Sequence, residues 1–207
     1  MANNVPAGEK VCTLKGPVDV ILLGERTALN FLQRMSGIAT ATQAYVKKVN
    51  NKDVRVVDTR KTVPGLRMLD KYAVKTGGGH NHRFGLFDGI LIKDNHLVAA
   101  GSITRAIVLA REKSPHTVKV EVEVEDLAGA EEAVKAGADI ILLDNMSPDA
   151  MAEAVRLIDS RALVEASGGI TLENIHEIAQ TGVDIISVGA LTHSPRAADF
   201  SLALKTV

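Results

Sequence analysis

The sequence predicts an α/β fold, a (β/α) barrel of irregular, TIM-like form, and three observations support this prediction. Short apolar segments alternate with segments of helical periodicity from about residue 54 to residue 193. From residue 89 onward the apolar segments recur at intervals of roughly 20 to 30 residues, the length of a strand–helix–strand unit. Glycine-rich segments follow the last two apolar segments.

Six strands are expected, each a short run of apolar and β-branched residues. They lie at residues 55–59, 89–93, 118–125, 139–144, 163–167 and 185–189. Two of the intervening helices show an apolar stripe at helical spacing, formed by Ile103, Ala106, Ile107 and Ala110 in one and by Ala130, Ala133, Val134 and Gly137 in the other. Each stripe can cover one face of a parallel sheet.

Helix boundaries are predicted from capping residues. Ser147 is followed by Pro148, which is favoured in the first helical turn. Thr171 is a candidate cap for the next helix, and Gly137 and Gly182 stand where helices are expected to end.

The strands alone do not distinguish a barrel from an open, doubly wound sheet. Ser167-Gly168-Gly169-Ile170 and Ser187-Val188-Gly189-Ala190 follow the last two expected strands. In (β/α) barrels the loops after these strands hold phosphate with backbone amides, which favours the barrel. The alternative is that these glycines only permit tight turns.

Composition narrows the class of ligand. The 207 residues include 24 basic and 25 acidic side chains, and 46% are hydrophobic. Near-neutral charge argues against nucleic acid as a partner. No apolar run reaches the length of a membrane span and the first residues do not resemble a signal peptide, so a cytoplasmic protein is expected. The single cysteine, Cys12, is expected to be at least half-buried.

Basic side chains are concentrated between residues 58 and 96. The members of this group are Arg60, Lys61, Arg67, Lys71, Lys75, His80, His82, Arg83, Lys93 and His96. Positive charge beside expected strand ends predicts a pocket for a small polyanion. His80 and His82 also have the spacing of a metal pair, but no third zinc ligand of clear spacing accompanies them.

Acidic side chains lie at neighbouring strand ends. Glu121, Glu123 and Glu125 alternate along one expected strand, and Asp144 ends the next. Such carboxylates can share a magnesium ion with substrate phosphates. They can equally balance nearby lysines.

Many motifs occur together in a distinctive order. They are Glu25-Arg26-Thr27-Ala28-Leu29-Asn30, Ser36-Gly37-Ile38-Ala39-Thr40, Asp58-Thr59-Arg60-Lys61-Thr62, Pro64-Gly65-Leu66-Arg67, Lys71-Tyr72-Ala73, Gly77-Gly78-Gly79, Asn81-His82-Arg83, Leu91-Ile92-Lys93-Asp94-Asn95-His96, Val122-Glu123-Val124, Leu143-Asp144-Asn145 and Ala166-Ser167-Gly168-Gly169-Ile170. Together the motifs resemble quinolinate phosphoribosyltransferase, the nicotinate-nucleotide pyrophosphorylase (carboxylating) family, from about Val5 to the end of the chain.

The resemblance implies a pentosyltransferase of NAD biosynthesis that converts quinolinate and phosphoribosyl pyrophosphate to nicotinate mononucleotide, pyrophosphate and CO₂. It implies catalytic roles for Lys61, Lys93, Glu123 and Asp144, with Mg²⁺ at Glu123 and Asp144. Quinolinate is expected to contact Arg60, Lys61, His82 and Arg83, with Arg26 supplied by a neighbouring subunit, and Lys61 and Lys93 are expected to reach the donor. The 5′-phosphate and its surroundings are expected to involve Ser167, Gly168, Gly169, Gly189 and His193.

The resemblance also implies a domain organisation. Residues 1–50 resemble a remnant of an N-terminal α/β sandwich domain with its helical connection, most of that domain being absent. Residues 51–193 form the barrel, and residues 194–207 return toward the N-terminal region. A homodimer or higher homo-oligomer is expected. Two alternatives stay open: a related phosphoribosyltransferase for another aromatic acid, and a shortened, inactive form that binds ligands or assembles.

Overall fold

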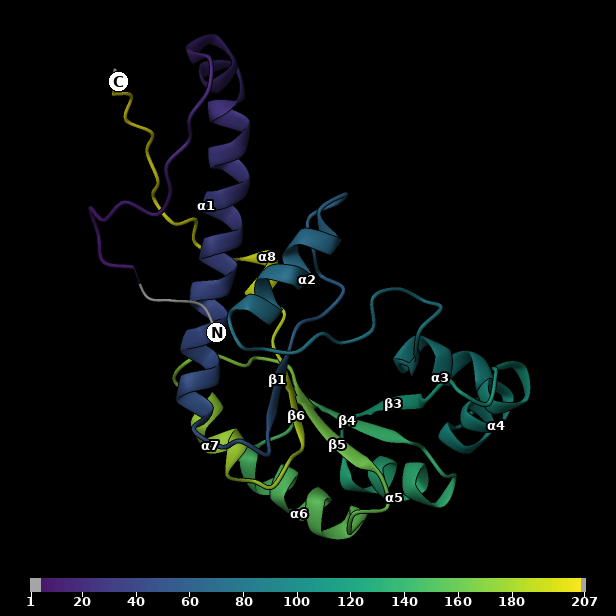
Figure 1. Cartoon of the computed structure of the whole chain (residues 1–207). Helices are drawn as coiled ribbons and strands as arrows, with labels where there is room; N and C mark the ends of the chain where they lie inside the picture. The colour runs from purple at the N-terminus through teal and green to yellow at the C-terminus, as the bar shows by residue number, and fades with distance from the viewer. Residues whose placement is uncertain (1–4, 206–207) are drawn as a thin grey trace.

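A computed structural model describes residues 5–205, and its centre is one six-stranded parallel sheet. The strands are β1 (Arg55–Val57), β2 (Ile90–Ile92), β3 (Val120–Val124), β4 (Ile140–Asp144), β5 (Leu163–Ser167) and β6 (Ile185–Ser187). Their order in the sheet is β1-β6-β5-β4-β3-β2 (Figure 1). All six expected strands are present, and most are one to three residues shorter than predicted.

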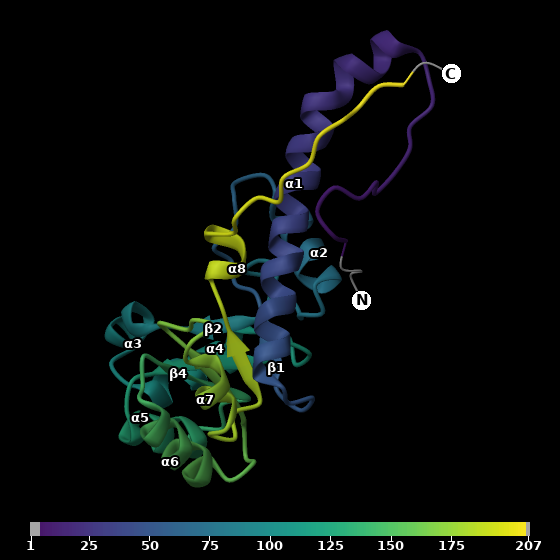
Figure 2. The ribbon, with the colours of Figure 1, turned by 90° about the vertical axis from the view of Figure 1, so that its left-hand side faces the viewer.

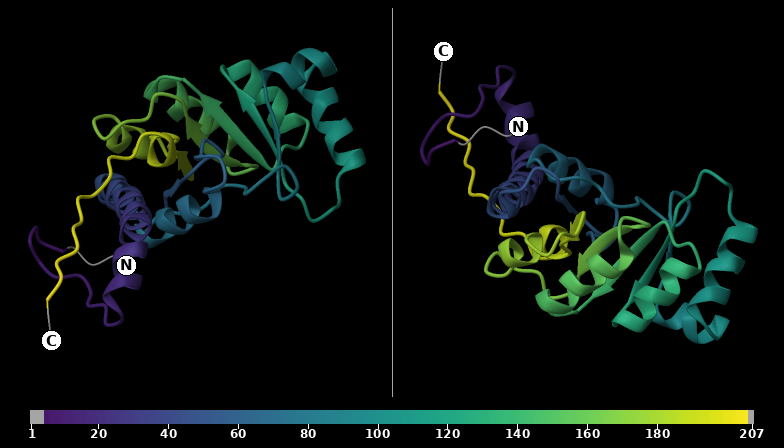
Figure 3. Two further views of the ribbon diagram at one scale, coloured as in Figure 1. Left: turned by 90° about the horizontal axis from the view of Figure 1, so that it is seen from above. Right: turned by 90° about the horizontal axis from the view of Figure 1, so that it is seen from below.

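Eight helices connect or flank these strands in the described residues. They are α1 (Val18–Val49), α2 (Arg67–Thr76), α3 (Asp94–Ala100), α4 (Ile103–Lys113), α5 (Leu127–Lys135), α6 (Pro148–Ile158), α7 (Ile175–Ala179) and α8 (Ala190–His193). Helices α5, α6 and α7 lie along the outer face of the sheet (Figure 3). The strand–helix alternation therefore follows the predicted pattern.

The two faces of the sheet differ in chemistry. Val122, Ile141, Val164 and Ile186 belong to the apolar core that the helices cover. Alternate residues point to the other face, where the row from β3 to β6 reads Glu123, Leu142, Glu165 and Ile185. This second face, on the inner side of the curved sheet, therefore carries carboxylates, whose burial in a purely apolar core would be unfavourable.

The barrel is irregular because its two edge strands, β1 and β2, do not pair with each other in the described residues. An isolated parallel bridge joins Val57 to His80, the residue after α2 at which the last part of the connection from β1 to β2 begins. This connection carries the Asn81-His82-Arg83 motif across the open side of the barrel. The parallel sheet and its alternating helices confirm the predicted α/β fold of irregular, TIM-like form.

Helix α1 stands partly outside the barrel. Its second half buries Ile38, Ala39 and Val49, whereas its first half exposes Val20 and Leu23. The segment after α8 runs back along α1, where Ala198 N–H donates to the Gln33 carbonyl (3.0 Å) (Figure 2). The end of the described chain therefore lies beside the projecting half of α1.

Local predictions had mixed outcomes. Ser147 caps α6, and its hydroxyl accepts from Ala150 N–H at 3.3 Å. Thr171 does not directly precede α7, because Asn174 occupies the N-cap position; the Thr171 hydroxyl instead accepts from Glu173 N–H in the turn before the helix. Cys12 is exposed, contrary to expectation, because it lies in the extended segment before α1. No helix within residues 5–205 is both long and apolar enough to span a membrane.

Candidate active site

A cleft of about 420 Å³ opens at the carboxyl end of the sheet, beside the gap in the barrel. The residues that line it are Arg60, Arg83, Leu86, Gly89, Ile90, Leu91, Lys93 and His96. Arg60 follows β1 and Lys93 follows β2, so the fold brings residues from both edge strands to one cleft. Three of the residues that line the cleft, Arg60, Arg83 and Lys93, are cations that were expected from the sequence to bind substrate.

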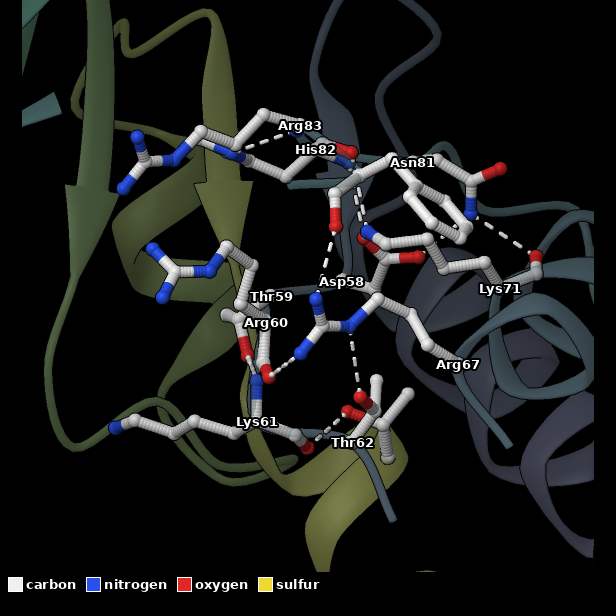
Figure 4. A network of polar contacts seen from close by, with 12 residues as sticks. Asp58, Thr59, Arg60, Lys61, Thr62, Arg67, Lys71, Asn81, His82 and Arg83 are labelled. Carbon is white, nitrogen blue, oxygen red and sulfur yellow. Dashed lines mark hydrogen bonds and ion pairs between the residues drawn. The ribbon is translucent and has the colours of Figure 1, made fainter. Parts of the chain in front are cut away.

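The two arginines form the most positive part of the cleft. Figure 4 shows the guanidinium groups of Arg60 and Arg83 pointing to the same side of the network. Arg83 Nη1 donates to the Gly89 carbonyl at 2.9 Å, which holds the side chain in the cleft. Partial burial and the neighbouring charge of Arg60 lower the pKa of Arg83. An anion bound between the two groups would relieve this repulsion.

A buried ion pair fixes the loop that carries Arg83. Asp58 is fully buried and accepts hydrogen bonds from Lys71 Nζ, Asn81 Nδ2 (2.5 Å) and His82 N–H (2.9 Å) (Figure 4). Lys71 Nζ also donates to the His82 carbonyl at 3.0 Å. Burial raises the pKa of Asp58, while the contacts with Lys71 and Asn81 oppose this shift. The motif residues Asp58, Lys71 and Asn81 therefore act as a scaffold.

The carboxylates expected to face ribose and magnesium lie at the ends of β3 and β4. Glu123 Oε2 is 2.5 Å from Lys93 Nζ, and Asp144 Oδ2 accepts from Asn145 Nδ2 at 2.7 Å. Each carboxylate has a second oxygen atom besides the one in these contacts. Hard oxygen donors on adjacent strand ends, next to a cationic cleft, fit a magnesium ion that also binds phosphate oxygens.

The glycine loops after β5 and β6 reach the same end of the sheet. A Cβ atom on Gly189 would lie 3.2 Å from His193 and 3.3 Å from the Lys61 side chain, so these three residues are neighbours. Gly168 has φ +88° and packs against Asn145 so closely that a Cβ atom would meet its Oδ1 at 2.2 Å. Ser167 is the register partner of Asp144. These loops thus adjoin the carboxylates.

Arg26 does not join this group. It is exposed on the projecting half of α1 and is not among the residues that line the cleft. Arg26 is expected to bind quinolinate in the cleft of a neighbouring subunit, so its role stays a prediction.

His82, which was expected to contact quinolinate, belongs to a buried cluster with two carboxylates that were not predicted as part of the site. His82 Nε2 lies 3.1 Å from Glu121 Oε2 and 3.5 Å from Glu165 Oε2. Burial by itself would lower the pKa of His82, but contacts with Glu121 and Glu165 outweigh it and raise the pKa to about 10. Burial also raises the pKa of Glu121. Glu165 could have been recognised in the sequence as a carboxylate in the middle of a largely apolar strand.

Comparisons with known proteins assign the family. Residues 38–203 match the family model described as quinolinate phosphoribosyl transferase, C-terminal domain, and residues 2–36 match the model for the N-terminal domain. The chain belongs to the quinolinate phosphoribosyl transferase family. This confirms the resemblance found in the motifs.

Individual quinolinate phosphoribosyl transferases agree with this assignment. A probable nicotinate-nucleotide pyrophosphorylase (carboxylating) of Bacillus subtilis is 50% identical over 94% of this chain and 68% of its own length. The human nicotinate-nucleotide pyrophosphorylase (carboxylating) is 43% identical over 94% of this chain and 67% of its own. The crystal structure of NadC from Streptococcus pyogenes superposes with a TM-score of 0.87 and 51% identity, over 90% of this chain and 65% of that one. The chain thus spans about two thirds of the length of these relatives.

Proposed function

We propose that this chain transfers the phosphoribosyl group of phosphoribosyl pyrophosphate to quinolinate with loss of CO₂. The ring nitrogen bonds to C1 of the ribose, and pyrophosphate leaves with the electron pair of the C1–O bond. The carboxylate beside the ring nitrogen departs as CO₂, and a proton takes its place. The products are nicotinate mononucleotide, pyrophosphate and CO₂, the pyridine nucleotide step of NAD biosynthesis.

The paired arginines of the cleft carry this proposal. Quinolinate has two adjacent carboxylates, and Arg60 and Arg83 offer two guanidinium groups from different loops to one side of the site. Guanidinium groups bind planar carboxylates through two parallel hydrogen bonds, which a lysine cannot do. Lys61 adds a third positive charge on the same side (Figure 4). A pyridine with a single carboxylate would leave part of this charge unpaired.

The donor half of the site follows from the charge that develops in the reaction. Cleavage of the C1–O bond leaves positive charge on the ribose and negative charge on pyrophosphate. Glu123 and Asp144 would stabilise the ribose, and Lys61 and Lys93 would stabilise the leaving group. The backbone of Gly168, Gly169 and Gly189, with Ser167 and His193, would bind the 5′-phosphate.

Magnesium is part of this proposal. Glu123 and Asp144 would hold the ion, which when bound neutralises charge on the pyrophosphate. Loss of CO₂ needs no further residue as electron acceptor, because ribosylation makes the ring nitrogen positive. The protein mainly positions two anions that would otherwise repel each other.

We also propose that the chain acts as a homodimer or larger homo-oligomer. The projecting half of α1 exposes Val18, Val20, Leu22 and Leu23, an unusual concentration of apolar side chains. A second copy on this surface would bury them and could bring its Arg26 toward the cleft.

Acceptor specificity tests the proposal. Calorimetry with purified chain should detect binding of quinolinate, and nicotinate, which lacks one carboxylate, should bind at least about 10-fold more weakly, since a charged hydrogen bond contributes about 1.5–3 kcal/mol. Equal affinity for the two acids would contradict the assignment and favour a phosphoribosyltransferase for another aromatic acid.

A further inference from the structure

Both backbone polar groups of Lys61 are bound by threonine hydroxyls. The N–H group of Lys61 donates to Thr59 Oγ1 at 3.1 Å, and its carbonyl oxygen accepts from Thr192 Oγ1 at 2.8 Å. The side chain of Lys61, by contrast, is exposed and extends on the same side as Arg60 (Figure 4). The backbone of this cation is therefore fixed, while its ammonium group stays accessible to a ligand.

Thr192 is itself held in place. It is fully buried and belongs to the short helix α8. Its carbonyl oxygen accepts from Arg34 Nη2 on α1 at 3.0 Å. The last carbonyl groups of a helix have no partner within that helix, so the guanidinium group supplies one. A single threonine thus connects Arg34 to the backbone of Lys61.

The same guanidinium group also holds Asp70 of α2. Arg34 Nε and Nη2 donate to the two carboxylate oxygens of Asp70 at 2.9 and 2.8 Å. Asp70 is fully buried, and its Oδ2 accepts from Val63 N–H at 3.3 Å. Arg34 therefore restrains the segment after β1 at two points, at Lys61 through Thr192 and at Val63 through Asp70.

Stability alone explains this arrangement poorly. The side chain of Asp70 is fully buried, and that of Arg34 is 23% exposed. Desolvation offsets much of the attraction in a buried ion pair, and an apolar pair of similar volume often stabilises a fold equally well. A guanidinium group that binds a carboxylate through two hydrogen bonds, however, fixes direction as well as distance. The geometry therefore favours a role in placing the segment after β1.

We propose that Arg34, Asp70 and Thr192 form a clamp that positions Lys61 for the transfer reaction. The three residues are not among the described residues that line the cleft, so they are positioning residues. A fixed backbone lowers the entropy that Lys61 loses when it binds an anion, and a displacement of about 1 Å can slow a reaction strongly. The inference rests on the proposed function for what Lys61 does; the clamp can be measured without substrate.

Replacement of the Thr192 hydroxyl tests the contact with Lys61. Thr192→Val keeps the shape of the side chain but donates no hydrogen bond, whereas Thr192→Ser keeps the hydroxyl. We expect Thr192→Val to lower kcat about 3- to 10-fold, the effect of one hydrogen bond, because Lys61 would stabilise the leaving group. The KM for quinolinate should change less than about 2-fold, since the arginines bind this acid, and Thr192→Ser should restore kcat.

Thr181→Val is the matched control. The Thr181 hydroxyl donates to the Ile178 carbonyl at 2.7 Å, shortly before β6 and at the opposite end of the sheet from the cleft. This variant should leave kcat unchanged. An unchanged kcat in Thr192→Val, an equal loss in Thr181→Val, or no recovery in Thr192→Ser would overturn the proposal. Thermal melting checks that each variant is folded.

Arg34→Lys tests the clamp from α1. Lysine keeps a positive charge near Asp70, but one ammonium group does not reproduce a planar fork directed at both Asp70 and Thr192. We expect a loss of kcat similar to that of Thr192→Val, and little further loss when the two substitutions are combined, because both act on the placement of Lys61. Additive losses would contradict a single clamp.

Amide hydrogen exchange tests the clamp without substrate. The N–H groups of Lys61 and Thr62 donate to Thr59 Oγ1 and to the Arg60 carbonyl. In Thr192→Val, exchange at these two amides should become about 3- to 10-fold faster, while exchange within the buried strand β4 stays the same. Unchanged exchange at Lys61 and Thr62 would overturn the proposal. If the wild-type chain forms no nicotinate mononucleotide, the proposed function fails, while hydrogen exchange still decides whether the clamp exists.

Discussion

Arg83 lies where the scaffold, the cleft and the buried cluster meet. Its backbone contacts His82, and its side chain donates to Gly89 and faces the same side as Arg60. Asp58 and Lys71 hold the preceding residue from both sides. Such restraint lowers the entropy that a flexible arginine would lose when it binds an anion.

Replacing Arg83 should therefore separate binding from folding. Arg83→Ala is expected to weaken quinolinate binding about 10- to 100-fold, because a charge-assisted contact of about 1.5–3 kcal/mol is lost. Calorimetry measures the change. Arg111→Ala is a matched control, since Arg111 binds Asp139 and Gly137 before β4, at the opposite end of the sheet from the cleft. Similar losses in both variants would indicate a general effect on folding.

The titration of His82 predicts how stability depends on pH. Its pKa is about 10 in the folded chain against 6.5 for an ordinary histidine, so the folded state retains more protons between these values. The His82 contribution is complete below pH 6.5 and is lost as pH rises toward 10, by at most about 1.4 kcal/mol per pH unit. Urea unfolding of wild type and His82→Asn at pH 7 and pH 9 measures it. The variant should lose less stability over this interval; parallel losses would contradict the assignment.

At the scale of elements, the loops after β4 and β5 depend on Gly168. Its positive φ and the 2.2 Å approach of Asn145 Oδ1 leave no room for a side chain. Gly168→Ala is expected to lower the free energy of unfolding by about 1–3 kcal/mol because of this clash, in addition to the cost of placing alanine at a positive φ. Gly137→Ala is the control, because Gly137 also has a positive φ (+79°) but meets no atom within 4 Å. It should cost about 1 kcal/mol. Equal losses in urea unfolding would show that the clash relaxes freely.

Elements were predicted from the sequence more completely than contacts. Strand β4 reads as a continuous apolar run before Asp144, and β3 alternates valine with glutamate, so the positions of both strands were evident. Helix α8 has only four residues and shows no periodicity. Glu165 was missed because its partner, His82, lies far away in the sequence on the connection between β1 and β2. The curvature of the sheet brings them together, and a single sequence does not show that curvature.

At the scale of the whole molecule, the barrel and the projecting half of α1 are distinct in character. The barrel encloses the apolar core, and the inward face of the sheet supports the cleft. The projecting half of α1, with the returning segment after α8 beside it, exposes apolar side chains (Figure 2). The cleft and this surface are therefore expected to respond separately to substitution.

Self-association should depend on the projecting half of α1. Leu23 is 87% exposed, so Leu23→Glu removes an apolar group without disturbing the described core. Sedimentation equilibrium is expected to show a homo-oligomer for wild type and a shift toward monomer for the variant. Val98→Glu is a control on α3, where the side chain is 84% exposed. An unchanged mass in Leu23→Glu would place the interface elsewhere.

The most direct measurement is mass-spectrometric detection of nicotinate mononucleotide after the purified chain is mixed with quinolinate, phosphoribosyl pyrophosphate and magnesium. We predict that nicotinate mononucleotide forms together with an equal amount of CO₂. The product should be lost in a folded Lys61→Ala variant, because the Lys61 ammonium group lies on the same side as Arg60 and Arg83. A folded wild-type chain that binds both substrates and yields no nicotinate mononucleotide would contradict the proposed function.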